Sequence, residues 1–517
     1  MRLSELVAAL SLGIDLGFSQ PMEHILRHTL IALRLAERIG LDSDQRSIVY
    51  YTSLLIGVGC HTDAHEQAKW FGDDIMVKSN KYDYDGKSLR AAASQMSKLG
   101  SGSPLLHRFR VGIEFVVSGH RDLDGMVAHH NKMACLLAEQ LGLPAGVLDA
   151  LAHAYEQWDG RGWPGEKKGD DIPLAMRIAQ VAEFVEVAHR IDGIEGAKRL
   201  ARERSGGQFD PSLAEIVVRE AEMLFAGLDE VVTWDAVIDV EPTLALTLSG
   251  DGFDRALEAI ANHIDLKSPY FLGHGRAVAE LAEAAGEQAG LHADDRTMLR
   301  RAGLVCGFGR LGVSNAILDK KGPLGPGEWE RVRMHPYLTE RMLRQSSALA
   351  PLGALAVQLR ERLDGSGYPR GLSGGAITRP ARVLAAADAY QAMREPRPHR
   401  EAYTAERAAS ELRADVKAGR LDAEAVEAVL GAAGHRVLRR LEGPAGLTTR
   451  EVEVLRLLAR GLTNKDIAAM LTITPKTVSN HVEHIYTKIG ASTRAMASVF
   501  AVQHGLLPEE EFVPASV

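Results

Sequence analysis

Two long stretches of this chain repeat the same residue types at the same spacing, and this repeat limits the possible folds more than any other feature. His24 and His274 each open a pattern rich in Ala, Leu, Glu and Arg, and each lies 16 residues before a glycine. A histidine, a glutamate 26 residues later and a carboxylate 53 residues later recur as His130, Glu156 and Glu183, then His335, Glu361 and Asp388. Such offsets predict two copies of one domain, and apolar residues at three- and four-residue spacing predict that it is helical.

The length of 517 residues exceeds what one hydrophobic core usually serves and indicates several domains. The expected boundaries are 1–225 for the first copy with an insertion at about 70–118, 226–253 for a linker, 254–434 for the second copy, 435–445 for a second linker, 446–507 for a C-terminal domain and 508–517 for a tail.

Charge and cysteine content exclude several classes. The net charge of −8 means that any nucleic-acid surface must be local rather than spread over the chain. Cys60, Cys135 and Cys306 form no Cys-x-x-Cys pair, which argues against a disulfide framework and a thiolate zinc site. Because no window approaches the length of an apolar membrane span and no cleavage signal follows the N-terminus, we expect a cytoplasmic protein without a membrane partner.

One short loop occurs in both copies and carries a family resemblance. The segment EQWDGRGWPG at 156–165 mirrors ERLDGSGYPRG at 361–371. The second copy also contains IDLKSPYFLGHGRAVAELA, GRLGVSNAILDKKGPLGPGEWERVRMHP and RPHR in the same order as the HD-GYP family. Both copies resemble that all-helical family, over about 21–225 and 254–434. The resemblance implies a phosphohydrolase whose active members cleave cyclic di-GMP with two or three divalent metal ions and a metal-bound hydroxide.

Both copies depart from the family where it places its metal ligands. The resemblance implies a His-Asp pair and two adjacent histidines, and their places hold Ile56-Gly57 and Ala154-Tyr155 in the first copy, then Cys306-Gly307 and Leu359-Arg360 in the second. Each copy keeps three ligand-like residues: His24, His130 and Glu183 in the first, His274, His335 and Asp388 in the second. Without the bridging aspartate they should not hold a hydrolytic metal pair, so we predict no catalytic residue and no firm cofactor. Packing without metal and one divalent ion per bundle are the two alternatives for these six residues.

Two further groups of side chains have alternative interpretations. His61, Asp63 and His65 lie close to the missing His-Asp place and could rebuild a metal site, although a solvated polar helix start explains them as well. Trp158, Trp163 and Tyr368 could stack on a purine ligand, although aromatic residues in helical domains more often belong to the core.

The segment from Gly446 to Gly505 has a different pattern. Thr448 with Glu451, and Thr463 with Asp466, predict two helix starts, and Thr474 before Pro475 predicts a third. Helix, short turn and helix is the arrangement that lays a second helix in the DNA major groove. The segment carries seven Lys and Arg residues against four Asp and Glu, and therefore supplies a local basic surface in an acidic chain.

This segment resembles the LuxR-type helix-turn-helix over its whole length, in residues that include Thr448, Glu451, Gly461, Ile467 and Val478. In the expected recognition helix, Val478, Val482 and Ile485 form the buried stripe. Lys465 and Lys476 should contact phosphate or guanine, and Asn480 should read a base edge. The full set of predicted DNA-binding residues is Asn464, Lys465, Lys476, Thr477, Ser479, Asn480, His481 and Lys488.

These observations predict an all-α protein with two HD-GYP-like bundles followed by a four-helix LuxR-type domain. The predicted function is a DNA-binding transcriptional regulator whose catalytically disabled bundles sense a ligand, form a dimer, or both. The expected partners are double-stranded DNA, a second copy of the chain, and a small-molecule or nucleotide ligand. The alternative is an active cyclic dinucleotide phosphodiesterase with an attached DNA-binding domain.

Overall fold

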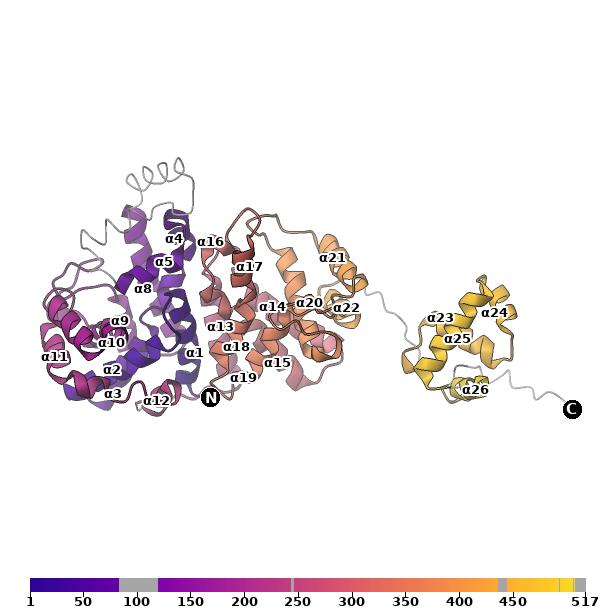
Figure 1. Ribbon diagram of the computed structural model, residues 1–517, viewed down its shortest axis with the longest axis horizontal. Helices are drawn as coiled ribbons and strands as arrows, with labels where there is room; N and C mark the ends of the chain where they lie inside the picture. The colour runs from indigo at the N-terminus through magenta and orange to yellow at the C-terminus, as the bar shows by residue number, and fades with distance from the viewer. Residues whose placement is uncertain (83–119, 243–245, 436–443, 492, 505, 507–517) are drawn as a thin grey trace. The chain divides into compact units, whose positions relative to one another are not determined.

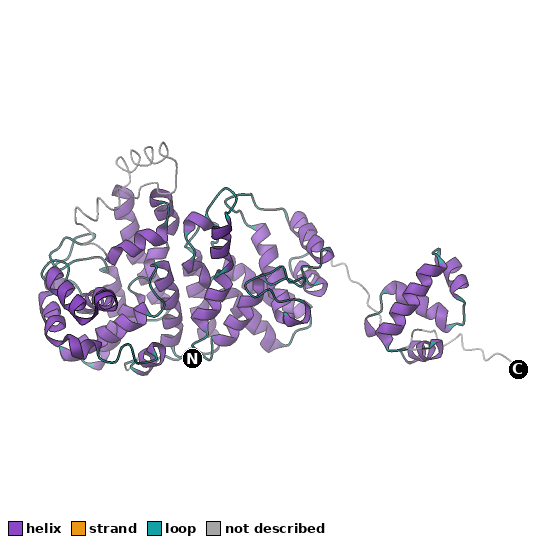
Figure 2. Cartoon of the chain, in the orientation of Figure 1, coloured by secondary structure: helices purple, strands orange, loops and turns teal. Residues whose placement is uncertain are grey.

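The computed structural model describes residues 1–82, 120–242, 246–435, 444–491, 493–504 and 506. These residues form α-helices and 3-10 helices (η) joined by loops, and the only β pairing among them is in isolated bridges. Figure 2 shows this helical architecture. The predicted all-α fold class is confirmed. Most of the expected insertion at about 70–118 and all of the tail at 508–517 lie outside the described residues.

The chain folds into two compact units, residues 1–435 and 436–517 (Figure 1). Within the first unit we call residues 1–242 the first half and residues 246–435 the second half. The elements of the first half are α1 (Leu3–Gly17), α2 (His24–Arg38), α3 (Ser43–Leu55), η1 (Val58–His61), α4 (Ala64–Phe71), α5 (Asp74–Ser79), η2 (Asn80–Tyr82), α8 (His120–Gln140), α9 (Ala145–Ala152), η4 (Gly169–Asp171), α10 (Leu174–Arg204), α11 (Pro211–Phe225) and α12 (Thr233–Asp239).

The second half follows with a similar succession of helices. Its elements are α13 (Gly250–Asp265), α14 (His274–Gln288), α15 (Ala293–Val305), η5 (Phe308–Gly312), α16 (Asn315–Leu318), α17 (Pro326–Arg333), α18 (His335–Leu343), α19 (Ala350–Ala356), η6 (Val357–Arg360), η7 (Gly374–Ala376), α20 (Arg379–Arg394), α21 (Ala405–Lys417) and α22 (Ala423–Ala432). The glycines that close α2 and α14, Gly40 and Gly290, have φ of +78° and +69°, the left-handed conformation typical of a helix C-cap.

Helix α1 joins the cores of the two halves. It is buried along almost its whole length and packs against α2 and α3 on one side and against η5 and α18 on the other. At Gly13 an added Cβ would lie 2.4 Å from the Met342 side chain and 2.8 Å from that of Leu311, so α1 approaches the second half closely at this point. The two halves therefore share one hydrophobic core.

A polar cluster also ties the halves together. Asp74, at the start of α5, is fully buried and accepts hydrogen bonds from the Ser314 hydroxyl at 2.9 Å and the Asn315 N–H at 2.7 Å. The ammonium groups of Lys78 and Lys267 lie 2.9 Å and 3.2 Å from the same carboxylate. Burial alone would raise the pKa of Asp74, but the two lysine charges outweigh it and hold the pKa well below its ordinary value.

The segment expected as a linker at 226–253 contains a helix that packs on the first half. Helix α12 contacts α2, and its Trp234 and Val237 are buried. The Tyr50 hydroxyl donates to the Val237 carbonyl at 3.1 Å, which anchors the helix. This connection is therefore part of the fold rather than a loose tether.

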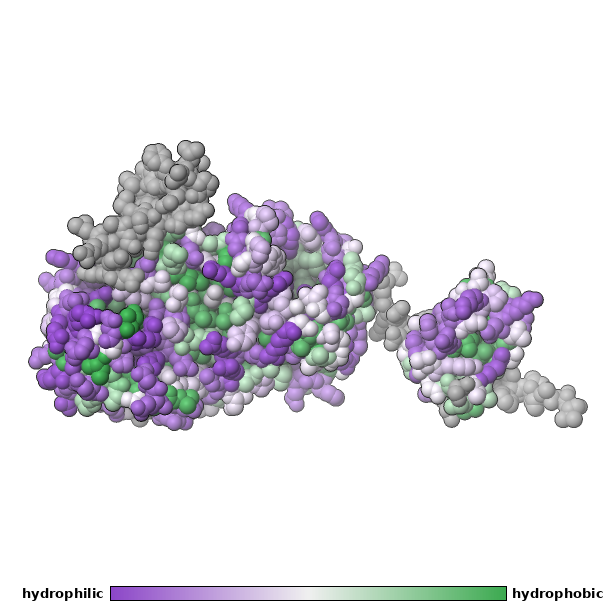
Figure 3. Space-filling view, viewed as in Figure 1, coloured by the Kyte–Doolittle hydropathy of each residue, from purple (hydrophilic) through white to green (hydrophobic). Residues whose placement is uncertain are grey.

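The C-terminal unit consists of η8 (Pro444–Gly446), α23 (Thr449–Ala459), α24 (Asn464–Leu471), α25 (Pro475–Ile489) and α26 (Arg494–Gln503). The capping boxes predicted at Thr448 and Thr463 are confirmed, and the Thr474 side chain caps α25 by accepting from the Thr477 N–H. A separate apolar core holds these helices together. On the face visible in Figure 3, hydrophilic residues surround a small apolar area of this unit.

Candidate functional site

The two family-like loops are each organised by a buried glutamate. Glu361 accepts hydrogen bonds from the backbone N–H groups of Arg370 and Leu372, both at 2.8 Å. Glu156 accepts in the same way from Gly165 at 3.2 Å and from Glu166 at 2.9 Å. These contacts hold the loop backbone itself, so the loop sequence has a structural role that needs no metal ion.

A glycine in each loop makes a close approach to this glutamate. A Cβ added at Gly367 would lie 2.4 Å from the Cα of Glu361, and one added at Gly162 would lie 2.4 Å from the Cα of Glu156. Both positions therefore require glycine, and the same local geometry occurs in the two halves.

In the first half, a lysine forms an ion pair with the carboxylate that is the candidate metal ligand. The Lys81 ammonium donates to the two carboxylate oxygens of Glu183 at 2.7 Å and 2.9 Å, and the Tyr82 hydroxyl donates at 3.0 Å. Burial alone would raise the pKa of Glu183, but the Lys81 charge outweighs it and lowers the pKa. Both oxygens are thus already paired with a cation of the chain itself.

The two candidate histidines of the first half also have protein partners. His24 Nδ1 lies 2.5 Å from Glu186 Oε2, and its Nε2 lies 3.3 Å from the Tyr82 hydroxyl. His130 Nε2 lies 2.9 Å from Asp63 Oδ2, on the opposite side of its ring from the Tyr155 hydroxyl, which lies 3.3 Å from Nδ1. In the structure His24 therefore pairs with Glu186, and His130 pairs with Asp63.

A cavity of about 240 Å³ lies beside these groups in the first half. Apolar and aromatic side chains line it together with a similar number of polar and charged ones, among them Lys81, His130 and Glu183. The lining includes Cys60, Phe71, Lys81, Tyr155, Trp163 and Phe184.

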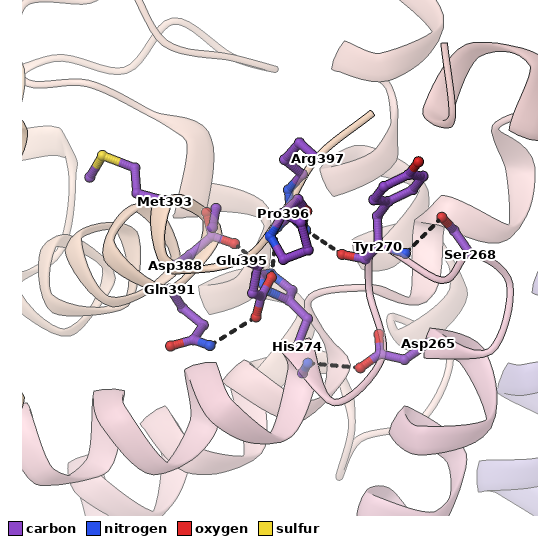
Figure 4. A network of polar contacts seen from close by, with 12 residues as sticks. Asp265, Ser268, Tyr270, His274, Asp388, Gln391, Met393, Glu395, Pro396 and Arg397 are labelled. Atoms are coloured by element: carbon purple, nitrogen blue, oxygen red, sulfur yellow. Dashed lines mark hydrogen bonds and ion pairs between the residues drawn. The ribbon is translucent and has the colours of Figure 1, made fainter. Parts of the chain in front are cut away.

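In the second half, two carboxylates surround the candidate histidine on α14 (Figure 4). His274 Nδ1 lies 2.8 Å from Glu395 Oε2, and Nε2 lies 3.3 Å from Asp388 Oδ1. Both ring nitrogens thus face carboxylate oxygens of the chain itself. His274 is therefore placed to hold two carboxylates together.

In the second half, an arginine forms an ion pair with the carboxylate that is the candidate metal ligand. The Arg360 guanidinium lies 3.0 Å from Asp388 Oδ2, and Asp388 is fully buried. Burial would raise the pKa of Asp388, but the Arg360 charge outweighs it and holds the pKa well below its ordinary value. The residue that replaces a family histidine thus forms an ion pair with the residue that the family would use as a metal ligand.

His335 is buried, and only one of its nitrogens has a partner. Its Nδ1 lies 2.7 Å from the Val332 carbonyl, which can only accept, so Nδ1 carries the proton and Nε2 the lone pair. Burial and the charges of Arg360 and Arg310 lower the pKa of His335 to about 3, which keeps the ring neutral.

The residues present do not fit the divalent metal centre that the family resemblance implies. Within the described ranges, no group of three or more His, Cys, Asp or Glu side chains is placed to hold a metal ion. Lys81 and Arg360 already supply positive charge to Glu183 and Asp388. A dication beside either carboxylate would be repelled by the resident cation.

The alternative ligands His61, Asp63 and His65 point to different partners. His61 lies in η1 and is buried, with Nε2 3.1 Å from the His263 carbonyl and the two rings 4.8 Å apart. His65 lies on α4 with Nδ1 2.8 Å from Asp319, and Asp63 faces His130. The run is not a solvated helix start, because His61 and Asp63 are buried against other elements.

The aromatic residues of the loops have mixed surroundings. Trp163 lines the first-half cavity, and the Trp158 ring lies beneath the Arg177 guanidinium at 5.5 Å. Tyr368 is partly exposed, with its ring 6.4 Å from that of His335. Only Trp163 and Tyr368 therefore lie beside a candidate site.

Sequence reasoning did not identify Lys81, Tyr82 and Arg310 as site residues. Lys81 and Tyr82 lie at the start of a segment that reads as a charged insertion, and nothing local indicates that it returns to Glu183. Arg310 lies in the motif GRLG, which begins one of the segments that resemble the HD-GYP family, but the resemblance assigns it no metal ligand. The only indication in the sequence would have been a lysine or arginine close to the positions where the family's metal ligands are missing.

The predicted recognition helix α25 has one buried face and one exposed face. Val478 and Ile485 are buried, and Val482 packs against the core from a partly buried position. The predicted DNA-contacting residues Lys476, Ser479 and Asn480 are exposed on the other face. Lys465 is exposed on the preceding helix α24, while Thr477 and His481 are partly buried.

Three of the predicted DNA-binding residues, Lys488, Asn464 and Ser479, make side-chain contacts between elements of the domain. Lys488 donates to Glu451 Oε2 at 2.7 Å and to the Gly446 carbonyl at 2.9 Å, so it links α25 to the start of α23. Asn464 Nδ2 donates to the Ser479 hydroxyl at 3.3 Å and links α24 to α25. These bonds fix the angle between the helices of the motif.

Two family descriptions match parts of the chain. Residues 258–425 match the family described as HD domain, and residues 445–501 match bacterial regulatory proteins of the luxR family. Response regulator protein VraR of Staphylococcus aureus is 41% identical over 73 residues, which cover 14% of this chain and 35% of that protein. No helix among the described residues has the length and apolar character needed to cross a bilayer.

Two comparisons cover most of the chain. The 3'3'-cGAMP-specific phosphodiesterase 3 of Vibrio cholerae is 32% identical over 410 residues, which cover 78% of this chain and 89% of that protein. A crystal structure described as that of cyclic GMP-AMP specific phosphodiesterases of V. cholerae superposes with a TM-score of 0.59 at 28% identity, covering 84% of this chain and 98% of the other.

Proposed function

This chain belongs to the family of HD-domain proteins that includes 3'3'-cGAMP-specific phosphodiesterase 3 of Vibrio cholerae, and we propose that it is a DNA-binding transcriptional regulator. In this proposal, residues 1–225 and 254–434 are two HD-GYP-like copies that do not catalyse hydrolysis, and residues 446–507 bind DNA. The copies bind a ligand, form a dimer, or both.

The C-terminal unit supports the DNA-binding part of the proposal. It combines a luxR-family match with three capped helices and a recognition helix whose outer face carries Lys476, Ser479 and Asn480. A lysine and an amide on the exposed face of such a helix suit phosphate and base-edge contacts respectively.

The observation that best supports the loss of hydrolysis is the presence of a basic side chain on each retained carboxylate. Lys81 pairs with Glu183 in the first half, and Arg360 pairs with Asp388 in the second. The positions of the bridging aspartate hold Gly57 and Gly307. Hydrolysis by paired metal ions needs ligands that converge without such competition.

The matched loop geometry supports the proposal of two copies. Gly162 and Gly367 make the same close approach to Glu156 and Glu361. Asp15 also accepts from the Ile25 N–H and Asp265 from the Gly275 N–H, ten residues further along in each half.

An apolar stripe on α26 supports a homodimer. Met496, Val499 and Val502 follow one another at three-residue spacing and are 48%, 55% and 55% exposed. Apolar side chains at this spacing share one face of a helix, and an exposed apolar face is typical of a protein interface.

The second candidate function is a cyclic dinucleotide phosphodiesterase that also binds DNA. The phosphodiesterase activity for which the V. cholerae relative is named favours it. It requires metal ligands other than the ion-paired carboxylates.

One experiment separates the two functions. The purified full-length chain is assayed for hydrolysis of 3'3'-cGAMP and cyclic di-GMP with Mn²⁺ or Fe²⁺ supplied, and for binding to DNA selected from a random pool. We expect selective, salt-dependent DNA binding without turnover. Turnover together with two bound metal ions per half would favour the enzyme, and a lack of DNA selectivity would refute the regulator.

A further inference from the structure

The cavity of the first half is lined by aromatic and apolar side chains from four separate helices. Phe18 lies at the end of α1, Phe71 ends α4, Met126 lies on α8 and Phe184 lies on α10, and all four are buried. An apolar cavity of roughly 150 Å³ engineered in another protein holds benzene. The cavity here measures about 240 Å³ and therefore has room for a fused two-ring molecule.

The charged side chains of this lining already have partners within the protein. Lys81 pairs with Glu183 at 2.7 Å, and Lys78 pairs with Asp74 at 2.9 Å. The Glu156 carboxylate accepts hydrogen bonds from N–H groups of its own loop. Because separating a buried ion pair is costly, the described lining residues leave no unpaired lysine for a phosphate group.

One neutral polar side chain of the lining has an oxygen without a partner. Gln180 Nε2 donates to the Glu156 carbonyl at 2.8 Å, and Gln208 accepts from Arg204 at 2.7 Å. Gln67, on α4, differs from both, since it is only 7% exposed and its Oε1 is buried without a hydrogen bond. Buried polar atoms in folded proteins nearly always have partners, so this oxygen marks a place for a donor on a bound molecule.

We propose that the first half binds a neutral aromatic molecule whose N–H or O–H group donates to Gln67 Oε1. The Phe18 and Phe184 rings suit such a ligand, because aromatic rings pack edge to face or with an offset. Tyr155 and Trp163 also line the cavity and are partly exposed, so solvent reaches this side of it.

The proposed ligand class differs from a phosphate ester in charge. A cyclic dinucleotide would place two phosphate groups beside lysines that already pair with Glu183 and Asp74, and a buried charge without a partner is strongly unfavourable. The inference rests on the proposed function, because it names the class of ligand that the first half of the regulator would bind.

Indole and 1-methylindole are the probes that test the ligand class, because they share a fused ring and differ in the N–H group. Each is titrated into the full-length protein by isothermal titration calorimetry. We expect indole to bind and 1-methylindole to bind about tenfold more weakly, since it leaves the buried oxygen unpaired. Guanosine 5'-monophosphate should not compete with indole.

Two variants place the binding in the cavity. Gln67→Met removes the amide and keeps the length of the side chain, so indole should bind it no more tightly than 1-methylindole does. Val127→Trp fills the cavity with a ring of the chain itself and should abolish binding of both probes. If Val127→Trp does not fold in a thermal unfolding assay, the comparison of the two probes in Gln67→Met still decides the outcome.

Two further variants are controls. Gln140→Met makes the same change at an exposed position of α8 and should keep the preference for indole. Tyr368→Ala changes the second half only and should bind indole as the wild type does.

The aromatic-ligand site would be overturned by no binding of indole, by equal binding of the two probes to the wild type, by unchanged binding to a folded Val127→Trp variant, or by displacement of indole by the nucleotide. None of these results alters the expected DNA selectivity or the expected lack of turnover. Turnover or unselective DNA binding would refute the proposed function without changing indole binding, so the two failures can be told apart.

Discussion

The Lys81 ammonium lies 2.7 Å from Glu183 Oε1, although the two residues are 102 positions apart in the chain. Lys81 lies in the short helix η2, which follows α4 and α5 in the chain. Helix α5 contacts the second half, because its Asp74 accepts a hydrogen bond from Lys267. The same segment therefore contacts the second half through Asp74 and closes the first-half site through Lys81. The first unit thus has an internal cation beside each retained carboxylate.

Removing this cation should destabilise the first unit. In Lys81→Met, the buried Glu183 loses its partner, and we expect a loss of about 1–3 kcal/mol in the free energy of unfolding, less than for a fully buried pair because Lys81 is partly exposed. Urea unfolding measures the effect. The exposed Lys132→Met is the matched control, and the double variant Lys81→Met with Glu183→Gln should recover part of the loss. Equal stability of Lys81→Met and wild type would contradict the ion pair.

Asp74 should make stability depend on pH. Its folded pKa is lowered, so its contribution is fully present above the unfolded value of about 3.9 and is lost as pH falls through the folded value. Asp74→Asn leaves Lys78 and Lys267 buried without a carboxylate and should cost about 3–5 kcal/mol at pH 7. The difference in the free energy of unfolding between wild type and Asp74→Asn should become smaller below about pH 4.

The measurement for Asp74 is urea unfolding at pH 7 and pH 3, with the exposed Asp149→Asn as control. If the difference in unfolding free energy between wild type and Asp74→Asn is the same at both pH values, the loss of stability comes from altered packing and not from the lost charge.

Rebuilding the metal centre in the second half should require the removal of Arg310. Cys306→His, Gly307→Asp, Leu359→His and Arg360→His restore the family's ligand types, and Gly307 has φ of −83°, which suits any residue. The new aspartate would meet the Arg310 guanidinium and pair with it. We therefore expect divalent metal uptake only when Arg310→Ala is added.

Metal content of the folded variants, measured by mass spectrometry, tests this order of effects. Metal uptake by the fourfold variant alone would show that Arg310 does not block the site. The corresponding glycine of the first half, Gly57, faces an apolar surface instead of a guanidinium. A Cβ at Gly57 would lie 3.1 Å from atoms of Ile14 and Phe18.

Two lysines of the recognition helix should have different roles, Lys476 in DNA binding and Lys488 in the stability of the domain. Lys476→Ala should weaken binding to all DNA sequences and lower the salt slope by about one, because it removes an exposed phosphate contact. Asn480→Ala should relax sequence choice. Lys488→Ala should instead lower the stability of the C-terminal unit, since Lys488 pairs with Glu451.

Fluorescence anisotropy over a range of salt concentrations, together with thermal unfolding, distinguishes these three results. If Lys476→Ala and Asn480→Ala both bind a selected DNA as the wild type does, another surface contacts the DNA.

Features that depend on neighbours along the chain could be predicted from the sequence. Thr448 with Glu451, and Thr463 with Asp466, determine helix starts because the capping groups are three residues apart. The glycines after α2 and α14 follow from the same local requirement. The helical class and the C-terminal motif were predictable for this reason.

Features that depend on the path of the chain were decided only by the tertiary structure. Lys81 reaches Glu183, Arg360 reaches Asp388, and α1 joins two cores, yet none of these contacts lies within one turn of helix. The sequence by itself determined which metal ligands are missing. It also placed Arg360 at a missing histidine, but it did not determine that Lys81 would pair with Glu183. The position of a side chain beside a distant carboxylate depends on how every intervening helix packs.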